Sequence, residues 1–315
     1  MLYCRYRTNR IQRKETDMNI TETLRNGKRK RVILDTDTYN EIDDQFALAL
    51  AMLSPKEIEL LAVTAAPFHN SNSDSYADGM EKSYNEIAKV MDLVEKSHGV
   101  KPVPYYRGST ERMPDVSTPV ASDAADAIYN IAMASDEITY VVAIGALTNV
   151  SSAITAHPEL AEKIAVIWLG GQARWYEGGG EFNLQGDRNA TNALYASSVP
   201  LLTVPCLGVA STLIMTLPEI EYQLRGNSPL GDYLCDNIKN CEPASHPVSW
   251  SRVIWDISAI CTLIDSRCYW CSDQPRFFTD ENYRYHPGQY DGTYEHIDGL
   301  HRDHVFSILF GRLKK

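Results

Sequence analysis

The sequence predicts an α/β protein built on a largely parallel β-sheet that is flanked by helices. Short apolar runs such as IAVIWL (164–169) have the length and β-branched content of strands buried on both faces. These runs alternate with longer segments of helical periodicity, such as residues 76–94. Alternation of strands and helices along a chain is typical of parallel sheets. A length of 315 residues is sufficient for one such domain.

The predicted elements follow one another in order along the first two thirds of the chain. Polar residues follow the run RVIL (31–34), Gly145 follows TYVVAI (139–144), and a pair of glycines follows IAVIWL. Each apolar run is thus followed by residues that are common where strands end. The strands that we expect are 31–34, 58–64, 139–144, 164–169 and 200–204, and the helices are 43–53, 76–94, a stretch from Asn149, and 189–196.

The two ends of the chain are less regular. Residues 1–30 are basic and polar, lack the apolar core of a secretory signal, and contain acidic residues that transit peptides usually avoid. We expect them to form a flexible, exposed N-terminal arm. Residues 218–315 mix helical periodicity with an aromatic-rich loop that holds Tyr283, Tyr285, Tyr290 and Tyr294. We interpret them as a C-terminal extension of a single domain that spans 31–315.

Composition restricts the class of partner. The formal net charge of −11 argues against a nucleic-acid partner held by phosphate contacts, and no apolar stretch approaches the roughly 18 residues of a membrane span. Seven scattered cysteines fit reduced thiols, and Cys268–Cys271 lacks the second pair that a zinc site needs. A cytoplasmic location is therefore the default expectation.

Four carboxylates lie within ten residues just after the first predicted strand, namely Asp35, Asp37, Asp43 and Asp44. Carboxylates brought together in a dry site repel one another, and a hard divalent cation relieves that repulsion. Oxygen ligands of this kind suit calcium or magnesium rather than zinc. Helix capping by Asp43 or Asp44 would explain neither of the other two acids. We therefore expect a metal or catalytic site at the carboxyl end of this strand.

The segment VILDTDT (32–38) fits the opening motif of two protein families. It matches the DxDxT motif of haloacid dehalogenase-type phosphotransferases, but their downstream lysine and later acidic motif have no convincing counterpart here. It also resembles the opening motif of inosine/uridine-type nucleoside hydrolases, with two extra residues between the DxD and DD pairs. Three further segments resemble the second family in the family's order, and these are GALTN (145–149), LGG (169–171) followed by EFN (181–183) and Asp187, and WDISA (255–259).

This resemblance to the calcium-dependent nucleoside hydrolases covers about residues 31–260 and implies a Rossmann-like nucleoside hydrolase fold. It assigns Ca²⁺ to the carboxylates of Asp37, Asp44 and Asp256 and to the backbone carbonyl of Ile144. Asp37 would also be the general base that deprotonates the attacking water. The side chains that would hold the ribose hydroxyls are Asp43, Asn70, Glu181 and Asn183. We expect Thr148 and Asn149 to cap a helix.

The resemblance further implies hydrolysis of the N-glycosidic bond of a ribonucleoside to ribose and free base. Bound calcium would lower the pKa of a water, and direct attack of that water on C1′ would invert the anomeric centre. Trp255 stands where many family members have a histidine that protonates the leaving base, and its large aromatic face favours a purine. The missing histidine leaves open an alternative, a nucleoside-binding protein without catalysis, and a haloacid dehalogenase-type phosphatase is third. The expected partner is a small nucleoside, with a homodimer or homotetramer expected from the resemblance alone.

Overall fold

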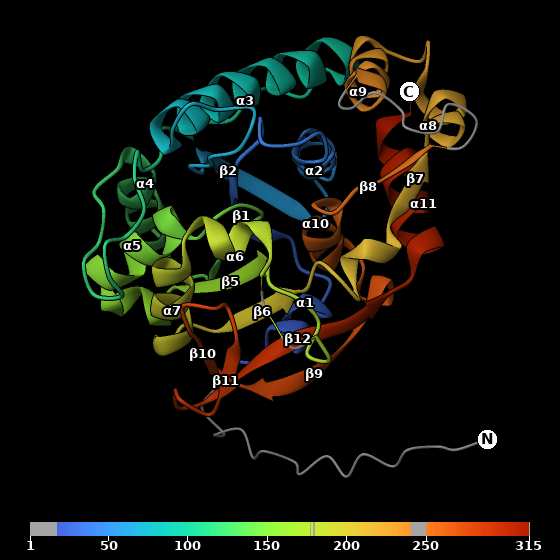
Figure 1. The fold of residues 1–315 in the computed structure, drawn as a ribbon. Coiled ribbons are helices and arrows are strands. Elements are labelled where there is room, and N and C mark those ends of the chain that lie inside the picture. Colours follow the sequence, from blue (N-terminus) through green and yellow to red (C-terminus); the bar gives the residue numbers. More distant parts are fainter. Residues whose placement is uncertain (1–17, 177, 179, 241–249, 315) are drawn as a thin grey trace, which may run out of the picture.

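A computed structural model of the protein describes residues 18–176, 178, 180–240 and 250–314. Its centre is an eight-stranded sheet in which every neighbouring pair is parallel except the last, β12 with β9 (Figure 1). In spatial order the strands are β3 (Tyr105–Tyr106), β2 (Ile58–Ala65), β1 (Lys30–Thr36), β4 (Thr139–Ala143), β5 (Ile164–Leu169), β6 (Leu201–Val204), β12 (Thr293–Leu300) and β9 (Tyr269–Pro275). The predicted α/β class with a largely parallel sheet is confirmed.

The two faces of the sheet bury separate hydrophobic cores because neighbouring residues of a strand point to opposite faces. In β1, Val32 and Leu34 join one core and Ile33 joins the other. The first core is packed by α1 (Ile20–Leu24), α2 (Asp44–Met52), α3 (Tyr76–His98), α8 (Leu217–Leu224), α9 (Pro229–Asn240), α10 (Ile257–Ile264) and α11 (Arg302–Leu313). The second is packed by α4 (Asp123–Met133), α5 (Thr148–Ala156), α6 (Phe182–Gly186) and α7 (Arg188–Ala196). Two small antiparallel pairs, β7 (Ile214–Thr216) with β8 (Ser251–Val253) and β10 (Phe277–Thr279) with β11 (Tyr285–Pro287), lie outside this sheet.

The five strands and four helices expected from the sequence correspond to β1, β2, β4, β5 and β6 and to α2, α3, α5 and α7. Local chemistry explains their ends, as α3 shows. The Ser75 side chain accepts a hydrogen bond from the backbone N–H of Asp78 at the start of α3, and Gly99 ends this helix with a φ of 74°. Among the described residues, no helix combines the length and apolar character needed to cross a bilayer.

Residues 218–315 are not the extension that we expected from the sequence. They supply β12 and β9, which complete the sheet, and the helices α10 and α11, which pack on one of its faces. The tyrosines that we assigned to a loop include Tyr285 in β11 and Tyr294 in β12. The prediction failed because β12 carries Glu295 and His296 in its middle, and both side chains are buried although they are polar.

The expected exposed arm over 1–30 is wrong for residues 20–24, whereas residues 25–29 are exposed as expected. Ile20 is fully buried, and residues 20–24 form α1. The carboxylate of Glu295 accepts hydrogen bonds from the backbone N–H groups of Ile20 (2.6 Å) and Thr21 (3.2 Å) and from the Thr21 hydroxyl (2.5 Å). This acceptor comes from the far end of the chain, so the local sequence gives no sign of it. Residues 1–17 of the expected arm lie outside the described residues.

Candidate active site

The carboxyl ends of β1, β4, β5 and β6 open onto one cavity of about 290 Å³. This is the edge of a parallel sheet at which ligands collect. The carboxylate side chains that line the cavity are Asp37, Glu41, Asp43, Asp44, Glu181 and Asp256. Among the described residues, the lining includes no lysine, arginine or histidine. The cavity is therefore suited to a cation and to a neutral ligand.

Three of these carboxylates meet at one point. Asp43, Asp44 and Asp256 are buried, and each offers an oxygen within 4.8 Å of the oxygens of the other two. Asp44 begins α2 and accepts a hydrogen bond from the Thr36 hydroxyl. Asp256 directly precedes α10. The structure thus brings together acids that lie more than 200 residues apart, by placing the starts of two helices side by side.

Asp43 lies at the N-terminus of α2, but its side chain makes no capping hydrogen bond. Its carboxylate instead accepts the backbone N–H groups of Trp255 (2.8 Å) and Asp256 (3.3 Å). Helix capping therefore does not explain this acid. The contacts join the loop after β1 to the start of α10, and they place Asp43 in the three-carboxylate group, where the sequence had suggested a ribose contact.

Asp37 faces the same cavity but does not belong to that group of three. Its side chain is 1% exposed, and neither of its carboxylate oxygens has a hydrogen-bond partner among the described residues. A Cβ atom at Gly145 would lie 2.9 Å from Asp37 Oδ1, so this position after β4 has no room for a side chain. Asp37 is held close against the β4 end with both oxygens available to a ligand.

The acids raise one another's pKa. Burial is the largest cause for Asp37, Asp43, Asp44 and Asp256, and repulsion between neighbouring carboxylates adds to it; the Thr36 hydroxyl acts in the opposite direction on Asp44. A buried group of like charges is costly unless it is protonated or neutralised by a cation. Because the donors are all oxygens, a hard divalent cation suits them best.

Ile144 and Asn183 meet at the ends of β4 and β5. The Asn183 side-chain amide donates to the carbonyl oxygens of Ile144 (2.9 Å) and Leu169 (3.0 Å). This leaves the Asn183 Oδ1 atom as the group that it can offer to a ligand, while the Ile144 carbonyl retains a second lone pair. Both residues line the cavity, and their expected roles as a metal ligand and a ribose contact stay predictions.

Glu181 caps α6 as well as lining the cavity. Its carboxylate accepts the backbone N–H groups of Gly171 (2.8 Å), Asn183 (2.8 Å) and Leu184 (3.0 Å), and burial raises its pKa. These three bonds fix the carboxylate in one orientation. The glycine pair after β5 and the EFN segment therefore form one unit around this acid.

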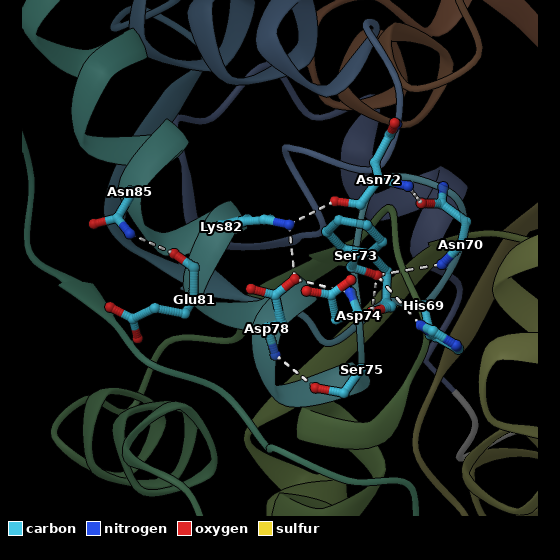
Figure 2. Close-up of polar contacts among 11 residues, drawn as sticks. His69, Asn70, Asn72, Ser73, Asp74, Ser75, Asp78, Glu81, Lys82 and Asn85 are labelled. Carbon is cyan, nitrogen blue, oxygen red and sulfur yellow. Dashed lines mark hydrogen bonds and ion pairs between the residues drawn. The ribbon is translucent and has the colours of Figure 1, made fainter.

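Asn70 is not among the residues that line the cavity, but its side chain contacts Asn40, which does line it. Its side-chain amide donates to Asn40 Oδ1 (2.6 Å) and to the Asn40 carbonyl (3.3 Å), and its own Oδ1 accepts the Asn72 N–H at 2.8 Å. Figure 2 shows Asn70 and Asn72 side by side in the loop before α3. The path of this loop after β2 is not visible in the sequence pattern, and the role of Asn70 as a ribose contact stays a prediction.

The expected capping role of the GALTN segment is also wrong. The position before α5 is Leu147, and Asn149 instead donates to Asp35 Oδ1 at 2.8 Å and accepts the Ser109 N–H. Burial raises the pKa of Asp35 to about 6. Thr148 donates to the Asp187 carboxylate at 2.8 Å. These contacts tie Asn149 to β1 and Thr148 to the start of α7, and neither side chain caps α5.

Trp255 is half-buried and lines the cavity next to Asp256. Several further lining residues had no role assigned from the sequence, and these are Asn40, Glu41, Gln172, Phe182, Cys206 and Leu207. Asn40 and Glu41 belong to the loop that is two residues longer than usual, so its length was the available sign. Cys206 and Leu207 follow the end of β6, where the strand-end rule would have found them.

The sequence comparisons agree with this geometry. Residues 32–286 match the protein-family model of the inosine-uridine preferring nucleoside hydrolases. A probable uridine nucleosidase 2 of Arabidopsis thaliana is 26% identical over 234 residues, which are 66% of this chain and 69% of that protein. A pyrimidine-specific ribonucleoside hydrolase of Enterobacter sp. (strain 638) is 28% identical over 221 residues, covering 62% of this chain and 66% of that protein.

Solved structures share the fold. A purine-preferring ribonucleoside hydrolase from Gardnerella vaginalis has a TM-score of 0.74 at 19% identity, covering 90% of this chain and 98% of that chain. A plant nucleoside hydrolase has a TM-score of 0.71 at 19% identity, covering 90% of this chain and 99% of that chain. The similar proteins include some named for purines and some named for pyrimidines, so similarity alone does not fix the base.

Proposed function

Because this chain belongs to the inosine-uridine preferring nucleoside hydrolase family, we propose that its carboxylate-lined cavity hydrolyses purine ribonucleosides with the help of a bound calcium ion. Ribonucleoside N-glycosyl hydrolase activity follows from the family. The single observation that carries the proposal is the meeting of Asp43, Asp44 and Asp256 beside the unpaired carboxylate of Asp37. A phosphotransferase of the haloacid dehalogenase type has no support, since the described lining holds no cationic side chain for a phosphate.

The donor set fits a calcium ion. Asp43, Asp44 and Asp256 are close enough to share one cation, Asp37 and the Ile144 carbonyl line the same cavity, and all of these ligands are oxygens. When bound, the ion would neutralise the clustered carboxylates and lower the pKa of a water molecule at C1′. We propose Asp37, Asp44, Asp256 and the Ile144 carbonyl as ligands, and the geometry adds Asp43 as a candidate.

Asp37 is the proposed general base. Its two oxygens are buried and have no hydrogen-bond partner among the described residues, so they are free to accept a proton from the attacking water. As the C1′–N bond breaks, positive charge develops on the ribose ring, and the surrounding carboxylates stabilise it. Because water attacks C1′ directly, the product ribose should have an inverted anomeric centre.

The ribose hydroxyls are assigned to Asp43, Glu181 and Asn183. Glu181 is fixed by three backbone N–H groups, and the Asn183 amide is fixed by two carbonyls, so neither side chain has to be ordered by the substrate. Such preorganised contacts orient the sugar at little entropic cost. This supports ribonucleosides over deoxyribonucleosides as substrates.

The purine preference rests on Trp255. Its half-buried indole lines the cavity, and a bicyclic base buries more of an aromatic face than a single ring does. The partner is a small nucleoside; assembly as a homodimer or homotetramer and a cytoplasmic location stay predictions.

The test is a comparison of kcat/KM for inosine, guanosine, uridine and cytidine, with and without a chelator and after calcium is restored. We expect ribose and free base from all active substrates, a higher kcat/KM for purines, and activity that returns with calcium. Binding of nucleosides with no release of ribose would show a protein that has lost catalysis. A higher kcat/KM for uridine would overturn the purine assignment alone.

A further inference from the structure

We propose that Asn40 donates a hydrogen bond from its side-chain amide to an acceptor atom of the nucleobase, and that Asn70 and Asn72 are positioning residues that hold it in place. The inference rests on the proposed nucleoside hydrolysis and names a contact for the leaving base. Asn40 lies in the loop between β1 and α2 and lines the cavity.

Three polar atoms of Asn40 are committed to protein partners. Its backbone N–H donates to the backbone carbonyl of Asp37 at 2.7 Å, so the loop folds back towards Asp37, the proposed general base. Its carbonyl oxygen accepts from the side chain of Asn72 (2.9 Å), and its Oδ1 accepts from the side chain of Asn70 (2.6 Å). The fourth, Nδ2, makes no hydrogen bond to any described residue.

This pattern fixes which way the Asn40 amide points. The oxygen and nitrogen of an asparagine amide are distinguished by their partners, and a donor from Asn70 requires that the oxygen lies on the Asn70 side. The atom that Asn40 can offer to the cavity is therefore the N–H₂ group, a neutral donor. Ionised carboxylates can only accept hydrogen bonds, whereas this N–H₂ group can donate one to an acceptor atom of the ligand.

The positioning residues are themselves anchored, as Figure 2 shows. The Asn70 Oδ1 accepts the Asn72 N–H at 2.8 Å, and the Asn72 carbonyl accepts Lys82 Nζ of α3 at 2.9 Å. Lys82 also pairs with Asp78 one turn earlier in α3, at 2.7 Å. The loop before α3 is thus tied to that helix, and Asn40 is held against a fixed support rather than by one mobile side chain.

A donor at this place serves the leaving group. When the C1′–N bond breaks and the C1′–O bond forms, the bond's electron pair goes to the base, while the proton of the attacking water goes to Asp37. The base leaves with negative charge on its ring, and a proton from solvent then neutralises it. Every nucleobase has acceptor atoms, such as purine N7 or pyrimidine O2, which gain charge in this step. A hydrogen bond from an amide N–H to one of these atoms is therefore stronger in the transition state than in the ground state.

The test is Asn40→Ala, assayed with inosine and uridine and by inhibition with ribose, the sugar product. We expect kcat/KM for the better nucleoside to fall about tenfold or more, because the variant loses a hydrogen bond to an atom that gains negative charge in the reaction. The inhibition constant of ribose should change less than about twofold, on the same principle, because no bond to the sugar is lost. Asn85→Ala is the matched control, since Asn85 is an exposed asparagine of α3 whose side chain donates to the Glu81 carbonyl and to no other described residue (Figure 2).

Asn70→Ala should lower kcat/KM less than Asn40→Ala, and it should add no further loss in the Asn40→Ala background. A merely structural role of Asn70 would instead add its effect in both backgrounds. Unchanged kcat/KM in Asn40→Ala, or an equal rise in the ribose inhibition constant, would overturn the inference. If Asn40→Ala does not fold, Asn40→Asp serves as the second variant, because it keeps the acceptor for Asn70 and lacks the donor. A wild-type protein without nucleoside hydrolysis would overturn the proposed function instead.

Discussion

Replacing Asp37 with asparagine separates the proposed general base from the fold around it. The change keeps the size of the side chain, and neither oxygen of Asp37 has a hydrogen bond to lose among the described residues. Positioned general-base catalysis contributes about 10²–10⁴-fold to a rate. This range corresponds to about 2.7–5.4 kcal/mol of transition-state stabilisation, at about 1.36 kcal/mol for each factor of ten. We therefore expect kcat for inosine to fall at least about a hundredfold.

Asp37→Asn should lower kcat, but it should not lower the stability of the metal-free protein. Asp37 is 1% exposed, and burial together with repulsion from Asp44 raises its pKa, so its ionised form is unfavourable in the metal-free fold. In the presence of a chelator, the thermal unfolding midpoint of Asp37→Asn should equal or exceed that of the wild type. Asp136→Asn is the control, because the Asp136 side chain is fully exposed and is not among the residues that line the cavity.

The assay follows release of free base at saturating inosine, and a ribose competition measures sugar binding in the same variant. The reasoning fails if Asp37→Asn retains more than about a tenth of the wild-type kcat, since a general base is worth more than that. It also fails if the variant unfolds well below the wild type in chelator, because Asp37 would then be holding the fold.

Three further changes test other parts of the structure. Trp255→Ala should lower kcat/KM about tenfold more for inosine than for uridine, since an aromatic stack is worth about 0.5–1.5 kcal/mol beyond its buried area; equal losses for both substrates would assign Trp255 to packing. Removal of calcium with a chelator should abolish turnover and lower the unfolding midpoint, because a ligand at a hundred times its Kd stabilises by about 2.7 kcal/mol; turnover that persists in chelator would contradict the metal site. Glu295→Ala should destabilise the fold by about 1–3 kcal/mol, because it leaves the buried N–H groups of Ile20 and Thr21 without their acceptor. Urea unfolding measures this loss, and an unchanged unfolding free energy would show that α1 does not depend on that carboxylate.

Strands that are buried on both faces could be predicted well from the sequence. The run 164–169 coincides with β5, because a short β-branched apolar segment has few other ways to bury itself. β12 could not be predicted in the same way, since Glu295 and His296 are buried in it by partners that come from elsewhere in the chain. The Glu295 carboxylate is satisfied by α1, and Thr203 of β6 lies 3.1 Å from the His296 Nδ1 atom.

The group of acids after β1 could be predicted from the sequence. Four carboxylates lie within ten residues there, and their mutual repulsion indicates a cation. The family resemblance assigned Asp44 and Asp256 to one metal. The structure places an oxygen of each within 4.8 Å of the other, and metal ligation itself stays a prediction. The contacts of the asparagine side chains near the cavity, Asn40 and Asn70, could not be predicted in this way. Whether Asn70 reaches the cavity or stops at Asn40 depends on the path of a loop, and neither periodicity nor composition records that path.

The hydrogen bonds between Glu295 and α1 join two segments that are synthesised far apart in time. The helix Ile20–Leu24 leaves the ribosome early, but the carboxylate that accepts its first N–H groups lies 275 residues later. A nascent chain that ends before residue 293 has neither that acceptor nor β12, and its β6 remains an open strand edge. The contacts of α1 with Glu295 and the pairing of β12 with β6 and β9 can therefore form only after residues 293–300 have been synthesised.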